Sequence, residues 1–308
     1  MPDQGIVFFV APSAGSGRAL RRLDYALSML RGGRVRTRIV AIRSFAEAGD
    51  HVETLESDEI PVAAGGDGTV NLLARALRAA GQADRGLVMM PLGTGNAFGY
   101  CFGHDTVPGA LLAIGAGTPL AIDVMTTTHP DLPLALVSIS AGFESRMLAS
   151  APRGFWSQWI GLIPTLLRVA PRSSTGIEIT VDGESLIGPA ERVYNAGFYN
   201  LPFYGFGRLM WPDADVTDGA AEAVVCRSGS AYWRVLRRGL RTARPEDGDP
   251  ACRRWHRARF RADGGVQIDG EVAAGGDFDV RVEPRGLTVL VAPRAWPPRA
   301  GRGPALSQ

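Results

Sequence analysis

Short apolar runs alternate with segments of helical spacing over the first third of the chain. Four of these segments have the apolar content of strands, and two carry apolar residues at intervals of three and four, as amphipathic helices do. Strands are predicted at 6–10, 34–42, 60–64 and 87–90, and helices at 18–30 and 70–80. This alternation predicts an α/β domain with a parallel sheet and helices on both of its faces.

The pattern changes after about residue 122, where short apolar segments are separated by Gly, Pro and Asp. It is typical of a mostly antiparallel β domain, interrupted here by two helices. Strands are predicted at 135–139, 177–181, 192–198, 223–225, 257–262 and 278–282, and helices at 156–169 and 231–243. The sequence thus predicts an α/β domain at 1–122, a β-rich domain at 123–292, and a disordered tail at 293–308 that is rich in Pro, Gly and Arg.

Composition narrows the chemistry of this 308-residue chain, which is longer than one hydrophobic core usually supports. All 33 basic residues are arginine. Because P-loop enzymes, protein kinases and Schiff-base enzymes each need a lysine, none of these classes fits. The four histidines lack the paired spacing of a zinc hydrolase. The three widely spaced cysteines predict no disulfide framework and favour a reducing cytoplasm.

Glycine-rich turns follow three of the predicted strands, at 11–17, 65–71 and 91–96. In a parallel sheet these turns lie at the carboxyl edge, where ligands bind. Glycine allows close approach to a phosphate, and a helix beginning near Thr69 would direct free N–H groups toward it. The alternative, that glycines only form tight turns, stays open for the first loop. Asp67 favours phosphoryl transfer, because an acid beside phosphates is costly without a metal or a proton transfer.

These motifs carry a family resemblance. Gly65-Gly-Asp-Gly-Thr-Val-Asn71, followed by Pro91-Leu-Gly-Thr-Gly-Asn96, resembles the diacylglycerol kinase catalytic family, in particular its soluble bacterial lipid kinases. The loop at 65–71 is shared with NAD and sphingosine kinases, whereas the loop at 91–96 separates the chain from NAD kinases. Further matches in chain order are Gly142-Phe-Glu144, Tyr204-Gly-Phe-Gly207, 212–219 and Ile268-Asp-Gly-Glu271, so the resemblance covers most of residues 6–290.

The resemblance implies an active site in the cleft between the domains, where ATP and Mg²⁺ bind. The implied nucleotide-binding residues are Ser13, Ser44, Gly65, Gly66, Asp67, Gly68, Thr69, Asn71, Gly93 and Thr94. Asp215, Asp218 and Ala220 are the implied magnesium site, and carboxylate and carbonyl oxygens are the ligands that this ion takes. The alternative for this segment is a solvated Asp-Gly turn.

The resemblance also implies that Glu271 accepts the proton of a lipid hydroxyl, with Asp67 as the rival base or as an organiser of the metal and phosphates. The segment containing Glu271 could equally be a hairpin turn, since Asp-Gly is a common hairpin signal. Ala11, Leu72 and Ala97 depart from the family's Asn, Glu and Asp. These departures leave two alternatives to a lipid kinase: a non-catalytic nucleotide- or lipid-binding regulator and, less favoured, an NAD kinase.

Two segments suggest contact with membranes. The aromatic-rich segment 154–170 has arginines near its ends, and arginines are dense along 232–244. The first suits a membrane interface and the second anionic headgroups, although an internal helix and a solvated face are the alternatives. A net charge of only +2, with no recognition motif, argues against nucleic acid. We therefore expect ATP and a membrane lipid as partners, a cytoplasmic location with peripheral contact at the inner membrane surface, and a chain that could form a homodimer.

Overall fold

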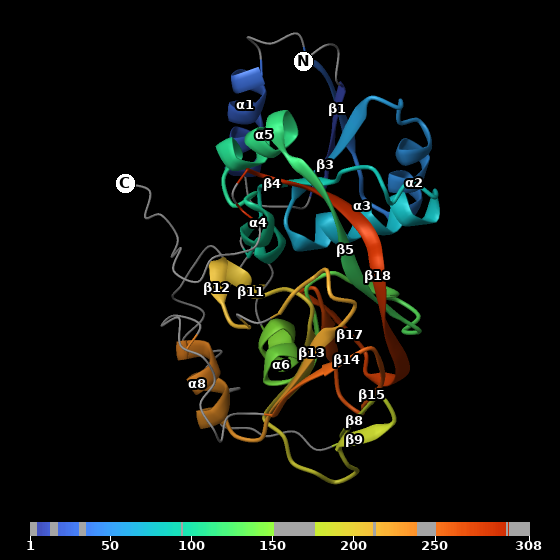
Figure 1. The fold of residues 1–308 in the computed structure, drawn as a ribbon, viewed down its shortest axis with the longest axis vertical. Helices are drawn as coiled ribbons and strands as arrows, with labels where there is room; N and C mark the ends of the chain where they lie inside the picture. Colours follow the sequence, from blue (N-terminus) through green and yellow to red (C-terminus); the bar gives the residue numbers. More distant parts are fainter. Residues whose placement is uncertain are drawn as a thin grey trace. The chain divides into compact units, whose positions relative to one another are not determined.

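The computed structural model describes residues 5–12, 18–30, 35–93, 95–150, 176–211, 214–238, 251–293 and 295. The chain divides into two compact units (Figure 1). The first contains residues 1–122, 205–207 and 285–308, and the second contains 123–204 and 208–284. Two strands, β5 (Thr118–Thr127) and β18 (Gly276–Val291), contribute residues to both units.

A four-stranded parallel sheet forms the centre of the first unit. Its strands are β1 (Gly5–Val10), β2 (Arg36–Ala41), β3 (Glu59–Gly65) and β4 (Val88–Pro91), in the order β2-β1-β3-β4. All four coincide closely with predicted strands. The central strands β1 and β3 are buried on both faces, as expected for a parallel sheet that is covered on each side.

Helices cover both faces of this sheet, as predicted (Figure 1). On one face, α1 (Arg18–Leu30) and α5 (Val107–Ala116) pack on alternate side chains of the strands. On the other face, α3 (Asp67–Ala79) contacts β1 and β3, and α2 (Phe45–Glu53) packs on α3. The short helix α4 (Ala97–Phe102) contacts β4. The pattern predicted α1 and α3, whereas α2, α4 and α5 were missed.

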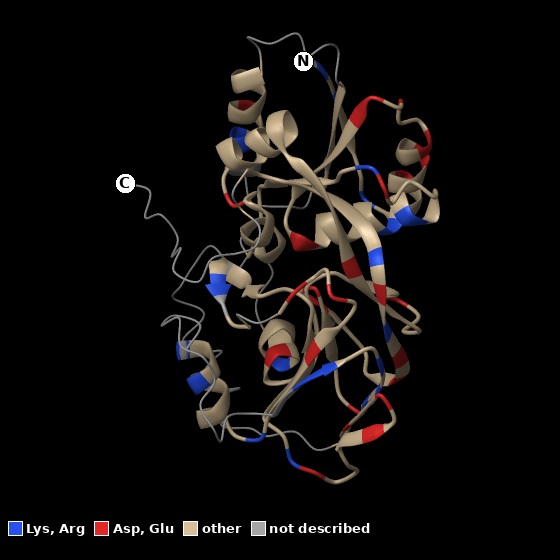
Figure 2. Ribbon diagram, viewed as in Figure 1, with Lys and Arg blue, Asp and Glu red and all other residues tan. Residues whose placement is uncertain are grey.

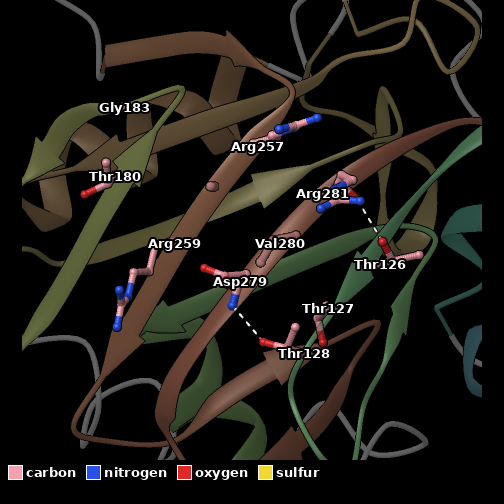
Figure 3. Close-up of a pocket in the computed structure, with 11 residues that line it drawn as sticks. Thr126, Thr127, Thr128, Thr180, Gly183, Arg257, Arg259, Asp279, Val280 and Arg281 are labelled. Carbon is pink, nitrogen blue, oxygen red and sulfur yellow. Dashed lines mark hydrogen bonds between the residues drawn. The ribbon is translucent and has the colours of Figure 1, made fainter.

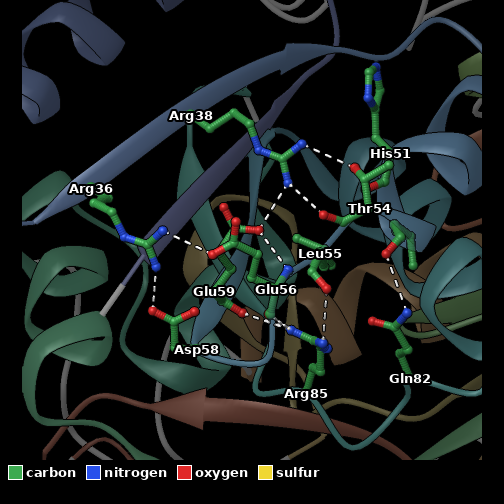
Figure 4. Close-up of polar contacts among 11 residues, drawn as sticks. Arg36, Arg38, His51, Thr54, Leu55, Glu56, Asp58, Glu59, Gln82 and Arg85 are labelled. Atoms are coloured by element: carbon green, nitrogen blue, oxygen red, sulfur yellow. Dashed lines mark hydrogen bonds and ion pairs between the residues drawn. The ribbon is translucent and has the colours of Figure 1, made fainter. Parts of the chain in front are cut away.

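Arginines, in the absence of lysine, form the ionic contacts along the β2 edge of this sheet (Figure 4). Arg36 lies 2.9 Å from Glu56 and 2.5 Å from Asp58, and Arg38 lies 2.9 Å from Glu59. Such exposed pairs contribute little to stability, because solvent and salt screen them. They attach the connection between α2 and β3 to the edge strand, away from the glycine loops.

The second unit consists mainly of two six-stranded sheets. The first has the order β14-β13-β10-β7-β16-β17 and the second the order β6-β5-β18-β15-β8-β9. The remaining strands are β6 (Leu134–Ala135), β7 (Ser138–Gly142), β8 (Ile177–Val181), β9 (Glu184–Ile187), β10 (Asn195–Tyr199), β13 (Ala221–Cys226), β14 (Ala251–Trp255), β15 (Arg257–Ala262), β16 (Val266–Ile268) and β17 (Glu271–Ala273). All neighbouring pairs of the first sheet are antiparallel, as the pattern predicts. In the second sheet the same holds for β6 with β5, β18 with β15, β15 with β8 and β8 with β9.

Apolar side chains from both sheets form one core in this unit. At its centre the ring of Phe198 lies 4.2 Å from that of Trp255 and 5.5 Å from that of Phe260. Alternate residues of β15 are buried and exposed, so its arginines face solvent while Ala258 and Phe260 face the core. Such alternation is typical of a strand with one face on the core and one in solvent.

Two helices and a small hairpin complete the second unit's described part. The helices are α6 (Phe143–Ser150) and α8 (Gly229–Arg238), and the hairpin pairs β11 (Phe203–Tyr204) with β12 (Arg208–Leu209) around the 3₁₀ turn Gly205–Gly207. Helix α8 confirms the first part of the helix predicted at 231–243 and carries arginines but no acidic residue (Figure 2). Its apolar side packs on an aromatic cluster with Phe143 and Tyr194.

Several predictions fall outside the described residues: the helix at 156–169, the end of the helix at 231–243, and the tail apart from Pro293 and Ala295. The strand predicted at 135–139 is instead divided into β6 and β7. The reason is that the intervening amides of Leu136 and Val137 donate to the Asp269 carboxylate rather than to a neighbouring strand. Among the described residues, no helix has the length and apolar character needed to cross a membrane.

Candidate functional site

The two main glycine loops of the first unit are joined backbone to backbone. The carbonyl of Gly65, at the end of β3, accepts hydrogen bonds from the amides of Leu92 and Gly93, each at 3.0 Å. A Cβ atom on Gly93 would lie only 2.5 Å from the Cα of Gly66. Position 93 therefore requires glycine. The structure brings Gly65, Gly66 and Gly93 together at the carboxyl edge of the sheet, where the sequence predicted them.

Helix α3 begins in the first of these loops. Its N-cap, Gly66, has no side chain to satisfy the first amides, and its carbonyl accepts from the amides of Thr69 and Val70. The first N–H groups of a helix have no partner within the helix, so this end can bind an anion. Thr69 is mostly buried, and a Cβ on Gly65 would lie 2.0 Å from its Oγ1. The predicted residues Gly68, Thr69 and Asn71 all lie in the first two turns of α3.

Asp67 connects the two loops through hydrogen bonds. Its carboxylate accepts from the amides of Ala97 at 3.1 Å and Phe98 at 3.0 Å, which begin α4. Asn96, the N-cap of α4, cannot satisfy these amides because its backbone is left-handed and its Nδ2 donates to the Gly93 carbonyl. Asp67 thus supplies from α3 the cap that α4 lacks. The part of Asp67 in proton or metal chemistry stays a prediction. Asn96, which joins α4 to the second loop, was not among the predicted site residues.

A third glycine segment lies beside these loops. A Cβ on Gly95 would be 3.4 Å from Asp67 Oδ2 and 4.0 Å from the Cα of Gly205. Gly207 has a positive φ of 67°, and a Cβ there would lie 2.6 Å from the ring of Tyr100. The segment 205–207 belongs to the first unit although the chain around it belongs to the second. This segment was not among the predicted site residues. The Gly-Phe-Gly spacing at 205–207 was the feature of the sequence that could have indicated it.

Three further residues predicted for nucleotide binding carry hydroxyls: Ser13, Ser44 and Thr94. Ser44 is the N-cap of α2, and its Oγ accepts from the amide of Glu47 at 3.2 Å. The Glu47 carboxylate in turn accepts from the amide of Arg43 at 2.8 Å, so Ser44 has a structural role at the end of β2. Ser13 and Thr94 lie outside the described residues. A nucleotide contact of Ser44 stays a prediction.

The predicted magnesium segment is an acidic turn of the second unit. Asp215 Oδ1 accepts from the amide of Thr217 at 2.9 Å and from its hydroxyl at 2.7 Å. Asp218 Oδ1 accepts from the amide of Ala220 at 3.0 Å. The turn is anchored on Asp123, a fully buried residue of β5, whose Oδ2 accepts from the amide of Gly219 at 2.6 Å. Asp123 was not predicted to support this turn. The sequence feature that could have indicated a special role is a single acidic residue within the apolar run 121–125.

The carboxylates of this turn are already engaged. The second oxygen of Asp218 forms an ion pair with Arg254 of β14. The oxygen donors are of the type that Mg²⁺ prefers, but a guanidinium occupies the second Asp218 oxygen and a backbone amide the first. Nowhere in the described ranges do three or more His, Cys, Asp or Glu residues gather as a metal site. In this arrangement Asp215, Asp218 and Ala220 do not form a complete magnesium site, and the assignment stays a prediction.

The Asp-Gly-Glu segment does form a hairpin, as the alternative interpretation expected. Asp269 and Gly270 have φ of 50° and 86° and connect β16 to β17, which is the geometry of a two-residue turn. The Asp269 carboxylate is mostly buried and accepts from the amides of Leu136, Val137 and Ser138 at 2.8–3.0 Å. Glu271, the first residue of β17, is exposed. Of the two acids, Glu271 is the one a substrate can reach.

One buried acid of the second unit did not enter the predicted site. Glu144, in the quoted Gly-Phe-Glu segment, is fully buried and accepts from the hydroxyls of Ser140, Tyr199 and Tyr232 at 2.5–3.0 Å. Burial raises the pKa of its carboxyl, while these hydrogen bonds act in the opposite direction. Glu144 thereby connects β7, β10 and α8 inside the unit. This interior position gives it a structural role.

Solved structures with the same fold exist. Two crystal structures of proteins from Bacillus anthracis superpose with TM-scores of 0.70 and 0.66. Each is 17% identical and covers 94% of this chain and 97% of the other. The second is described as a diacylglycerol kinase. The α/β unit with its glycine loops and the antiparallel unit that follows therefore form the fold of bacterial diacylglycerol kinase-like proteins.

The family comparison concerns mainly the first unit. Residues 5–127 match the family described as the diacylglycerol kinase catalytic domain. A protein of Enterobacter sp. named "Probable lipid kinase YegS-like" is 26% identical over 83% of this chain and 87% of its own length. An uncharacterised protein of Synechocystis sp. is 38% identical over 99 residues, which are 32% of this chain and 22% of that protein.

Proposed function

We propose that this protein is an ATP-dependent lipid kinase, which transfers the γ-phosphoryl group of ATP to a hydroxyl of a membrane lipid such as diacylglycerol. The observation that supports this most is the backbone contact between the loops of Gly66 and Gly93, beside the uncapped start of α3. Glycines at these positions keep Cβ atoms out of a site where phosphates approach amides closely. The relatives named as lipid kinases support the acceptor class.

The proposed step forms a bond between the lipid hydroxyl oxygen and the γ-phosphorus of ATP, and breaks the bond to the bridging oxygen of ADP. The hydroxyl proton passes to the Glu271 carboxylate, which is exposed and can exchange it with water. Amides at the start of α3 stabilise charge on the phosphates. Asp67 positions α4 against the second loop through its two backbone hydrogen bonds. ATP enters as its magnesium complex, which is a substrate.

Peripheral membrane contact on the cytoplasmic side accompanies this proposal, since the acceptor is a lipid. The face of α8 formed by Ser230, Trp233, Arg234 and Arg237 lines a hollow of about 350 Å³. Trp and Arg with no acidic residue on the helix suit an anionic interface. This feature supports the membrane contact that the sequence suggested for 232–244.

The experiment is incubation of the purified protein with γ-labelled ATP, Mg²⁺ and micelles of diacylglycerol, a sphingoid base or a monoacyl lipid, with NAD in a parallel reaction. We expect label in one lipid and none in NAD. Glu271→Gln should lower transfer, while Glu184→Gln, which changes an exposed acid of β9, should leave it unchanged. Formation of NADP would instead assign an NAD kinase.

A non-catalytic regulator of the same fold is the second candidate. It is favoured by Arg254, which is paired with Asp218, and by Ala97, which stands where the family has an acid. This candidate predicts ATP binding by calorimetry with no transfer to any lipid of the panel. The transfer assay therefore distinguishes the two.

A further inference from the structure

A polar hollow lies on the outer face of the second unit's sheet, formed by β5, β18, β15 and β8 (Figure 3). Its volume is about 510 Å³. All of its lining residues belong to the second unit, and none belongs to the predicted nucleotide, metal or catalytic sets. Its polar side chains include four threonines and three arginines: Thr126, Thr127, Thr128, Thr180, Arg257, Arg259 and Arg281.

Acid–base pairing accounts for two arginines on this face, Arg259 and Arg261. Arg259 forms two hydrogen bonds of 2.7 Å with Asp277, and Asp279 lies directly opposite it on β18. Arg261, two residues further along β15, pairs with Glu178 at 3.1 Å. These charges compensate one another across the strands, as opposite charges do in stable sheets. They leave no reason to expect a ligand at that end of the hollow.

Arg257 and Arg281 break this pattern. They are directly opposite each other on β15 and β18, and both are exposed. Within the described ranges, neither guanidinium forms an ion pair with a carboxylate. The nearby Asp182 accepts from the backbone amides of His256 and Arg257, at 3.0–3.3 Å. Like charges facing each other across a ladder are destabilising, and among the described residues no ion pair with a carboxylate compensates either guanidinium directly.

We propose that Arg257 and Arg281 bind a phosphate group in this hollow. Two guanidiniums on adjacent strands present planar N–H groups that match phosphate oxygens, and a dianion would compensate both charges. Figure 3 shows both side chains at the same end of the hollow, with Thr126 beside Arg281. This site is separate from the glycine loops and does not depend on the proposed kinase activity.

The phosphate could be a free anion or the headgroup of a phosphomonoester lipid. Inorganic phosphate, titrated by calorimetry with a saturating ATP analogue present, is the probe for the first. Vesicles of phosphatidylcholine with and without phosphatidic acid, assayed by sedimentation, are the probe for the second. Arg257→Gln with Arg281→Gln should weaken binding of one of these probes by about tenfold or more, since contacts to charged groups are lost. Arg261→Gln, which changes an ion-paired arginine of the same strand, is the matched control.

Arg281→Glu provides a second variant, which replaces the repulsive pair by an attractive one. Its thermal midpoint should rise while its binding of the probe is lost, so a failure to fold cannot explain the loss. A phosphate effect without a vesicle effect assigns a free anion, and the reverse assigns a lipid headgroup. If all four proteins bind both probes equally, or none binds either, the proposal is wrong. Neither result bears on lipid phosphorylation, which the transfer assay measures independently.

Discussion

The Cα of Gly66 lies so close to Gly93 that a Cβ atom on Gly93 would approach it to 2.5 Å. Gly93→Ala should therefore push the two loops apart. We expect a loss of about 1–3 kcal/mol in the free energy of unfolding, as for other overpacked sites, together with weaker ATP binding. Urea denaturation and nucleotide calorimetry measure the two effects.

Gly49→Ala is the matched control for this substitution. Gly49 lies inside α2, and a Cβ atom there would meet nothing within 4 Å. Alanine should raise the free energy of unfolding by about 0.5–1 kcal/mol, because glycine is unfavourable in a helix interior. If Gly93→Ala is as stable as the parent and binds ATP equally well, the loops are not in contact as described.

Sequence periodicity was sufficient for the sheet of the first unit but not for three of its helices. Helix α5 contains Val107-Pro-Gly-Ala-Leu-Leu-Ala-Ile-Gly-Ala116, which is apolar nearly throughout and has no period to read. Helix α4 begins after a left-handed Asn96 and is capped by Asp67, thirty residues earlier in the chain. A cap supplied from a distant segment leaves no local signature, since the usual signal is a residue at the N-cap itself.

Asp269 and Glu271 are two residues apart and should respond differently to neutralisation. Asp269→Asn keeps a residue that tolerates positive φ but removes one acceptor from three buried amides. We expect it to lower the free energy of unfolding by about 2 kcal/mol. Glu271→Gln changes an exposed side chain, so stability should change by less than about 0.5 kcal/mol.

Turnover separates the same two variants. If Glu271 is the base, Glu271→Gln should lower turnover at saturating MgATP by about 10²–10⁴-fold, while ATP affinity stays nearly unchanged. Single-turnover phosphorylation across a pH series measures this, and the variant should also lose the acidic limb of the profile. Retention of both rate and limb would exclude Glu271 and make Asp67 the candidate base.

The sequence could list the candidate acids but could not separate their roles. Asp67, Asp218 and Asp269 each precede a glycine in the sequence. Their roles depend on partners far along the chain: Asp67 on the start of α4, Asp218 on Arg254, and Asp269 on the amides of 136–138. Such partners follow from sheet pairing and register, which spacing does not reveal.

Arg254 should compete with Mg²⁺ for Asp218. The pair is partly exposed, with 56% and 25% of the two side chains accessible, so it contributes at most about 1 kcal/mol. If the acidic turn binds Mg²⁺, Arg254→Gln should tighten binding up to about fivefold. Calorimetric titration of the protein with Mg²⁺, in the absence of nucleotide, measures this affinity.

Arg253→Gln is the matched control, because the neighbouring Arg253 pairs with Glu184 instead, at 2.6 Å. It should leave Mg²⁺ binding unchanged, while Asp218→Asn should abolish it. Equal Mg²⁺ affinity in the parent, Arg254→Gln and Asp218→Asn proteins would remove the turn from the metal assignment.

His104 should make the first unit sensitive to acid. It is fully buried between α4 and α5, where Nδ1 accepts from the amide of Met89 and Nε2 donates to the carbonyl of Leu290 at 2.6 Å. Burial lowers the pKa of His104 to about 4, against an ordinary value of 6.5, although the hydrogen bond to Leu290 acts in the opposite direction. Between about pH 4 and pH 6.5 the folded chain therefore keeps this imidazole neutral, whereas the unfolded chain protonates it.

Stability follows from this difference in proton binding. Above pH 6.5 neither state protonates His104, and its contribution is fully present. As the pH falls from 6.5 toward 4, only the unfolded chain gains the proton, so up to about 3 kcal/mol of stability is lost. His104→Gln keeps an acceptor and a donor at this position but cannot titrate. Urea denaturation from pH 4.5 to 8 should show a shallower decline for this variant than for the parent, and parallel curves would contradict the assignment.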